Sequence, residues 1–173
     1  MLIEAIVRNW KQARESLIKE LEQIPAEEFD FRSASGTRSI TEIVKHILES
    51  QKVFVSEVCQ SGHDTDLQAV FAGVKRYQGE IAHINDKEGL ISLLRTNMDW
   101  AENTVRAFGE ELIQEETTRF DGIRVPRFET MNFMIGHEMY HCGQVTVYER
   151  MLGIEPALTV RFKKLTASQQ QPE

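Results

Sequence analysis

The chain has 173 residues, 41% of them hydrophobic and 27% charged, which is the composition of an ordinary globular protein. Its formal net charge of −7 argues against wrapping nucleic acid, because that usually requires a clustered basic face. No apolar run approaches the roughly 20 residues that span a bilayer, and the N-terminus does not read as a signal peptide. We therefore expect a single cytoplasmic domain over residues 1–173 with no nucleic-acid or membrane partner.

The first third of the chain predicts two amphipathic helices. A stripe of apolar residues at helical spacing runs through residues 2–24 and ends at Pro25, which cannot continue a helix. The second helix has a clearer start, because Ser39 and Glu42 fit a capping box, in which each side chain bonds to the backbone N–H of the other residue. This second helix should fray near residues 61–62.

The middle of the chain predicts less regular structure. Residues 63–86 hold only a short helical pattern at residues 67–74, and glycines weaken it. A third long helix is predicted after Asp86, where apolar residues return at helical spacing. The Asp121-Gly122 dipeptide is a turn signal, so we expect a small hairpin that pairs residues 119–120 with 123–125.

The last helix is predicted over residues 129–152, with Gly153 at a left-handed C-terminal cap. This helix is apolar nearly all round and should therefore be largely buried. The tail from about residue 163 is expected to be mobile. Four amphipathic helices with almost no strand indicate an all-α protein, a four-helix bundle.

The last helix carries the most informative motif of the chain, His137-Glu138-Met139-Tyr140-His141. Two histidines four residues apart lie on the same helix face, so both imidazoles can reach one metal ion. The same residues match H-E-x-x-H, the signature of zinc metalloproteases, with Glu138 as general base. Packed histidines in a helix interior are the simpler interpretation.

A metal centre needs a third protein ligand, and the sequence offers His46, His63 and His83. His63 and His83 fall in the irregular middle segment, where exposed loop positions are the simplest interpretation. His46 lies on the capped second helix, at the flank of its apolar stripe, and could face either a cleft or water. Periodicity alone does not choose among the three.

Two segments together resemble DinB/YfiT-like proteins. Residues 38–47 read RSITEIVKHI and resemble the second helix of that family, and residues 136–145 read GHEMYHCGQV and resemble its last helix. The resemblance covers nearly the whole chain. It implies an up-down-down-up four-helix bundle in which His46, His137 and His141 hold a divalent metal. Family members commonly have a basic residue where this chain has Cys142, which we expect to be a packing residue.

The resemblance further implies a thiol-dependent S-transferase, a mycothiol-type isomerase or a metal-dependent hydrolase acting on a small molecule. We favour transfer of a low-molecular-weight thiol to a small electrophile, because a three-histidine metal can activate a thiol without an elaborate acid–base set. Zinc, nickel, iron and manganese all suit three histidines. Gln144 and Tyr148 continue the histidine stripe and could line the pocket or orient a ligand, or simply pack at a helix crossing.

Three other functions stay open at this point. A metalloprotease would need a downstream ligand, but position 144 is Gln and position 147 is Val where one such family has glycine and histidine. Glu138 is then a surface or ion-paired carboxylate, or one that supports a ligand. The second and third functions are a non-catalytic binding module and a purely structural bundle. A homodimer formed through a helix face is compatible with a bundle of this size.

Overall fold

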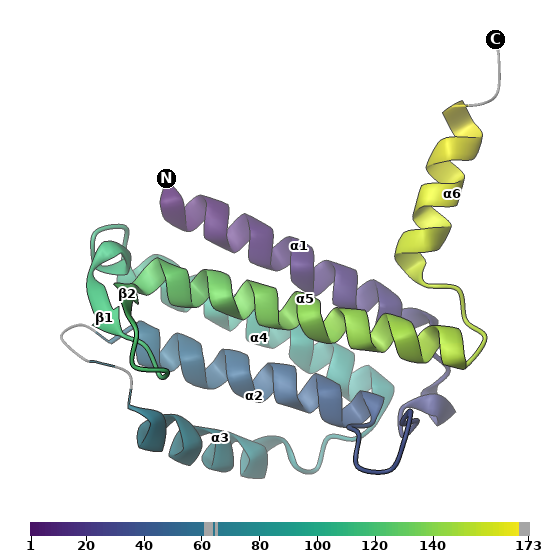
Figure 1. The fold of residues 1–173 in the computed structure, drawn as a ribbon, viewed down its shortest axis with the longest axis horizontal. Helices are drawn as coiled ribbons and strands as arrows, with labels where there is room; N and C mark the ends of the chain where they lie inside the picture. The colour runs from purple at the N-terminus through teal and green to yellow at the C-terminus, as the bar shows by residue number, and fades with distance from the viewer. Residues whose placement is uncertain (61–63, 65, 170–173) are drawn as a thin grey trace.

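The computed structural model describes residues 1–60, 64 and 66–169, and four long helices of this part pack side by side (Figure 1). These helices are α1 (Leu2–Gln23), α2 (Ile40–Val58), α4 (Lys87–Phe108) and α5 (Arg127–Met151). α1 and α2 each contact both α4 and α5. α1 and α5 run in one direction and α2 and α4 in the opposite one, so the predicted up-down-down-up bundle is confirmed (Figure 1).

The connection between α2 and α4 contains a further helix, α3 (Leu67–Ile81). Because α2 and α4 run in the same direction, the chain must return along the whole bundle between them, and the 15 residues of α3 cover about 22 Å of that path. Asp66 caps α3, since its side chain accepts a hydrogen bond from the N–H of Gln68. The predicted helix over residues 67–74 was therefore too short, and the predicted fraying at residues 61–62 lies outside the described residues.

Two predicted helix ends are confirmed in atomic detail. Ser39 Oγ accepts from the N–H of Glu42 at 3.3 Å, and the Ser39 N–H donates to Glu42 Oε2 at 2.8 Å, which completes the capping box at the start of α2. At the end of α5, Gly153 has φ +76°, and the N–H of Ile154 donates to the carbonyl of Glu149 at 2.8 Å. This is the Schellman arrangement, which glycine adopts without steric cost.

The chain between α4 and α5 forms a hairpin around the predicted turn, but its strands begin farther from the turn than predicted. Strands β1 (Glu116–Thr118) and β2 (Arg124–Pro126) pair antiparallel, with Thr117 opposite Val125. Short 3-10 helices at Ala26–Glu28 and Leu112–Gln114 complete the connections. The turn lay where Asp121-Gly122 predicted it, but five residues rather than two separate the strands.

The core consists of two apolar clusters that follow each other along the bundle. One cluster includes Leu17, Leu48, Leu94 and Val145, and the other includes Trp10, Val55, Met98 and Met131. The prediction that α5 is buried nearly all round was wrong, because the side chains of Met139, Tyr140, Val147 and Met151 are exposed. A helix with apolar residues on every side therefore leaves an apolar face in solvent beside the histidines.

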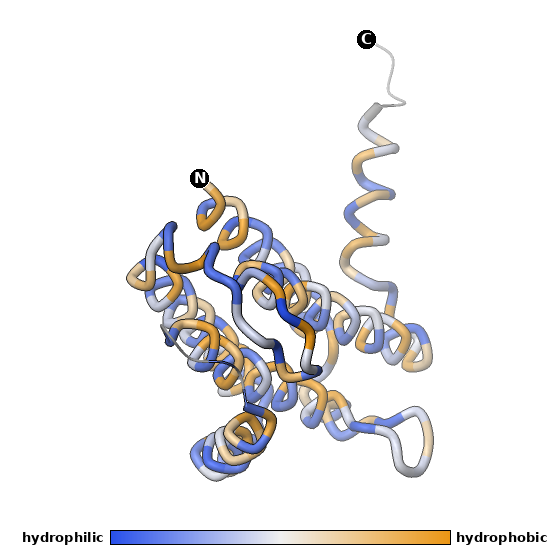
Figure 2. The backbone as a smooth tube through the Cα atoms, turned by 60° about the vertical axis from the view of Figure 1, so that its left-hand side comes forward, coloured by the Kyte–Doolittle hydropathy of each residue, from blue (hydrophilic) through white to orange (hydrophobic). Residues whose placement is uncertain are grey.

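A last helix, α6 (Ala157–Gln169), was not predicted and leaves the bundle at an angle (Figure 1). Apolar and polar residues alternate along it (Figure 2), and its exposed apolar side chains include Leu158 and Phe162. The tail expected to be mobile from about residue 163 is thus helical as far as Gln169, and residues 170–173 lie outside the described part. No helix among the described residues is both long and apolar enough to cross a membrane.

Candidate metal centre

Helices α2 and α5 bring the three predicted histidines together. His46 Nε2 and His141 Nε2 each lie 3.1 Å from His137 Nε2. One ring nitrogen from each of the three side chains falls within 4.8 Å of the other two. The ring centroids are 4.5–5.0 Å apart. This is the cluster expected from the resemblance, and among the described residues it is the one group of histidine, cysteine and acidic side chains with metal-binding spacing.

The separation of these nitrogens fits coordination to a single ion. Ligands at the usual zinc–nitrogen distance of 2.0–2.1 Å in a tetrahedron are about 3.3 Å apart. Without an ion, a proton on His137 Nε2 can point to only one of its two neighbours, so nitrogen lone pairs would be left facing each other. A cation satisfies all three nitrogens at once, so the residues present fit a divalent metal.

All three imidazoles are held in the neutral form that binds metal. Burial lowers the pKa of His46 and His137 to about 4, and the nearby Arg38 guanidinium and the neighbouring rings contribute to the decrease. Burial also lowers the pKa of His141, against the effect of its hydrogen bond to Gln144. The rings are therefore uncharged at neutral pH, with lone pairs available to a cation.

Gln144 lies where the sequence placed it, one turn beyond His141. The His141 Nδ1–H donates to Gln144 Oε1 at 2.7 Å, which leaves the lone pair on Nε2 facing the other two histidines. Such a hydrogen bond sets the ring orientation and the tautomer of a metal ligand. Nδ1 of His137 is buried and has no hydrogen-bond partner among the described residues.

Glu138 points away from the three histidines and into the bundle. It is 2% exposed and forms an ion pair with the equally buried Arg14. Trp10 Nε1–H donates to its Oε2 at 2.8 Å, and Arg14 Nη2–H donates to the same oxygen at 3.1 Å. The ion-paired interpretation is thus confirmed, but the side chain is buried rather than on the surface, and it is not available as a general base.

The ion pair belongs to a buried polar network that the sequence analysis missed. Arg14 also donates to the Leu94 carbonyl and to Gln51, whose Oε1 accepts a further bond from Asn97 at 3.4 Å. Arg14 follows Trp10 by four residues on the apolar stripe of α1. A basic residue on that stripe, and an acidic residue on the apolar last helix, were the signal for a buried pair.

A cleft of about 650 Å³ lies at the loop between α1 and α2; none of the three histidines lines it, and Gln144 connects it to His141. It is lined by polar side chains together with a few apolar ones, namely Ser33, Gly36, Thr37, Arg38, Ile43, Gln144, Val147 and Tyr148. Gln144 forms the wall between the cleft and His141. Tyr148 lines the cleft, which is one of the two positions that the sequence left open for it, and its hydroxyl donates to the Arg38 carbonyl at 2.9 Å.

The opposite side of the histidine cluster is aromatic. Phe133 stacks on His137 with ring centroids 6.5 Å apart, and Phe120 of the hairpin lies 5.5 Å from Phe133. Tyr140 contacts His141 edge-on and is exposed. A bound molecule would therefore meet polar groups on one side of the centre and aromatic rings on the other.

The remaining candidate residues do not join the site. His83 is exposed in the turn after α3, and His63 lies outside the described residues. Cys142 is 5% exposed within the core, so the prediction that it packs rather than binds metal agrees with its position. Cys59 and Cys142 are both free thiols, and burial raises the pKa of each to about 12.

Comparison with known proteins agrees with this geometry. The model of the DinB family matches residues 1–172, and the chain therefore belongs to the DinB family. No match was found among curated proteins. Among solved structures, the fold is similar to that of a DinB-like protein, YjoA, from Bacillus subtilis, with 21% identity, a TM-score of 0.65 and coverage of 86% of this chain and 92% of that one.

Two other solved structures share the fold and have a described activity. The mycothiol-dependent maleylpyruvate isomerase is 14% identical with a TM-score of 0.65, over 83% of this chain and 60% of the isomerase. YfiT from Bacillus subtilis, described as a probable metal-dependent hydrolase with an unusual four-helix bundle topology, is 12% identical with a TM-score of 0.66, over 88% of this chain and 89% of that one. At such identities the likeness establishes the fold alone.

Proposed function

We propose that this protein is a divalent-metal-dependent enzyme that transfers a low-molecular-weight thiol to a small electrophile. The observation that carries the proposal is the convergence of three neutral imidazoles: Nε2 of His137 lies 3.1 Å from Nε2 of both His46 and His141. When bound there, a divalent ion lowers the pKa of a coordinated thiol or water, which makes either one nucleophilic near neutral pH.

The surrounding residues suit thiol transfer. Three neutral ligands add no negative charge, so an incoming thiolate is not repelled by the site itself. Gln144 holds the ring of His141 in the tautomer that faces the centre, and Phe133 covers one side of His137. In the transfer, the thiol loses its proton to water, sulfur forms a bond to the electrophilic carbon, and the leaving group departs with its electron pair.

Hydrolysis by the same centre is the second candidate, supported by the likeness to YfiT. Hydrolysis usually requires a general base beside the attacking water. The carboxylate next to His137 in sequence, Glu138, accepts hydrogen bonds from Arg14 and Trp10 and does not face the histidines. The same geometry argues against an H-E-x-x-H protease, in which this glutamate must be the base.

The metal centre is tested by elemental analysis of untagged protein. We expect about one divalent ion per chain in the wild type, and its loss in His46→Ala and His137→Ala, since two imidazoles bind far more weakly than three. His83→Ala removes an exposed histidine of a turn and serves as the matched control with unchanged metal content. Metal retained without His46, or absent from every sample after reloading, would contradict the proposal.

Activity assays then separate the two candidates. The metal-loaded protein is incubated with an aryl halide and a set of small thiols, and separately with an activated ester and no thiol. Thiol-dependent conjugation that disappears in His137→Ala supports the transferase. Ester cleavage without thiol, lost in the same variant, would favour the hydrolase instead.

A further inference from the structure

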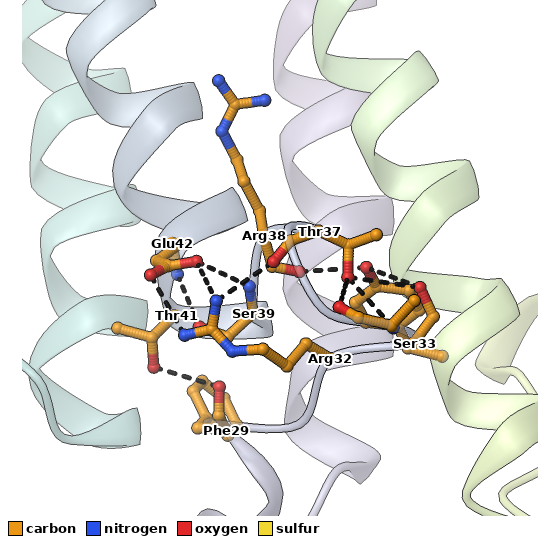
Figure 3. Close-up of polar contacts among 10 residues, drawn as sticks. Phe29, Arg32, Ser33, Thr37, Arg38, Ser39, Thr41 and Glu42 are labelled. Carbon is orange, nitrogen blue, oxygen red and sulfur yellow. Dashed lines mark hydrogen bonds and ion pairs between the residues drawn. The ribbon is translucent and has the colours of Figure 1, made fainter.

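Two arginines of the loop between α1 and α2 differ in their partners. Arg32 donates to both carboxylate oxygens of Glu42, at 3.0 and 3.1 Å, and to the Thr37 carbonyl. The guanidinium of Arg38 forms no hydrogen bond or ion pair with any described residue. Figure 3 shows it extended along α2, away from the cluster around Arg32. The loop therefore presents one cation whose charge is not neutralised.

Arg38 is linked to the candidate metal centre through the cleft that it lines. Gln144 lines the same cleft and is hydrogen-bonded to His141. A small molecule that fills the cleft would therefore lie between Arg38 and the residue that orients His141.

The first two carboxyl groups that follow Arg38 on α2 each have a hydrogen-bond partner other than Arg38. Glu42 accepts from Arg32 and from the Ser39 N–H. Glu49, on the next turns of α2, is buried and accepts from Gln78 Nε2 at 3.0 Å. A divalent ion held by neutral histidines would add positive charge. Arg38 is therefore a cation without a hydrogen-bonded or ion-paired partner among the described residues, in a chain of formal net charge −7.

Arg38 gives the cleft a cation that a carboxylate can bind. A guanidinium forms two parallel hydrogen bonds with a carboxylate, whereas the hydroxyl groups of Thr37 and Tyr148, which also line the cleft, already donate to the backbone carbonyls of Ala34 and Arg38. A single arginine balances a monoanion, whereas a phosphate dianion would need further cations that the lining residues do not supply. We propose that Arg38 binds the carboxylate of one reactant and so places its reacting atom at the three histidines. This proposal rests on the proposed function.

The test measures binding rather than turnover. Zinc-loaded and metal-free protein are titrated by nuclear magnetic resonance with 3-mercaptopropionate, its methyl ester and propionate, and the backbone amides of Gln144 and Tyr148 are followed. We expect the acid to bind the zinc-loaded wild type about tenfold more tightly than the ester, as a charge-assisted pair contributes. This tighter binding of the acid than of the ester should vanish in Arg38→Gln and persist in part in Arg38→Lys.

Arg32→Gln is the matched control, because it removes a positive charge from the same loop but from an arginine that is already ion-paired. This variant should prefer the acid over the ester as strongly as the wild type does. Equal binding of acid and ester by the wild type, or a preference that survives in Arg38→Gln, would overturn the role of Arg38. Mercaptopropionate that binds no more tightly than propionate would instead contradict thiol binding at the zinc while leaving the Arg38 comparison intact.

Discussion

Glu138 shows how neighbours in sequence serve different sites. His137 and Glu138 are adjacent on α5, but successive residues of a helix point about 100° apart. His137 therefore faces α2 and the metal centre, while Glu138 faces α1 and pairs with Arg14 inside the bundle. The H-E-x-x-H pattern thus combines two candidate metal ligands with a carboxylate of the core.

We predict that Glu138→Ala destabilises the protein by about 3–5 kcal/mol, because it leaves the charge of Arg14 buried without a partner. Urea unfolding followed by circular dichroism measures the loss. The double variant Arg14→Met, Glu138→Leu should recover much of it, since an apolar pair leaves no charge behind. If Glu138→Gln instead folded with wild-type stability and lost only activity, Glu138 would have to be a catalytic base.

A second buried carboxyl group of α5, that of Glu149, lies beside Glu20 of α1, which binds the start of α6. Glu149 is fully buried, and burial together with the neighbouring Glu20 raises its pKa to about 8. Glu20 accepts hydrogen bonds from the N–H groups of Ala157 and Leu158, at the start of α6. The raised pKa of Glu149 places a proton on this carboxyl group at neutral pH.

The folded chain holds a proton on Glu149 that the unfolded chain, with a pKa near 4.5, releases. The stabilisation is complete below pH 4.5 and is lost as the pH rises through 8. We predict that the free energy of unfolding falls by about 1 kcal/mol between pH 7 and pH 9, and that Glu149→Gln removes this decrease. Glu15→Gln, on the exposed side of α1, is the control and should follow the wild type.

At the scale of single elements, the sequence predicted helix ends most accurately. The capping box of Ser39 and Glu42 and the left-handed Gly153 lie at the predicted residues, because both depend on a few consecutive positions. The lengths of α3 and α6 could not be predicted in this way. α3 lies in the segment that joins two parallel helices, α2 and α4, along the length of the bundle. α6 begins where its first N–H groups donate to the carboxyl group of Glu20 in α1.

The cap of α2 should contribute to stability without contributing to metal binding. We predict that Ser39→Ala lowers the free energy of unfolding by about 1 kcal/mol, since the N–H of Glu42 loses its acceptor. Ser39→Thr keeps an acceptor at this position and should cost less. Thermal unfolding gives the comparison, and a Ser39→Ala protein as stable as the wild type would show that the capping box is energetically neutral here.

At the scale of the whole molecule, the metal centre joins two helices that are 91 residues apart at their ligands, His46 and His137. An ion bound there would add a link between α2 and α5 that the unfolded chain lacks. The two apolar clusters of the core lie on either side along the bundle and do not depend on that link. The apoprotein should therefore remain folded but be less stable.

We predict that a chelator lowers the melting temperature by about 5–10 °C without loss of helicity, as expected for a ligand present at about 100 times its dissociation constant. Circular dichroism with and without chelator measures both quantities. His137→Ala should melt at the temperature of the chelated wild type and respond little to chelator. Complete unfolding on chelation would show that the metal, rather than the core, holds the bundle together.

The sequence by itself determined the four long helices and the pair of candidate metal ligands on α5. Helical periodicity and caps depend on neighbouring positions, and a spacing of four residues places His137 and His141 on one face whatever surrounds them. Tertiary structure alone decided the rest. Which flank of α2 faces α5, and so whether His46 reaches the other two histidines, depends on helix packing, as do the pairing of Arg14 with Glu138 and the isolation of Arg38. These contacts join residues far apart in sequence, and no local pattern encodes their distance.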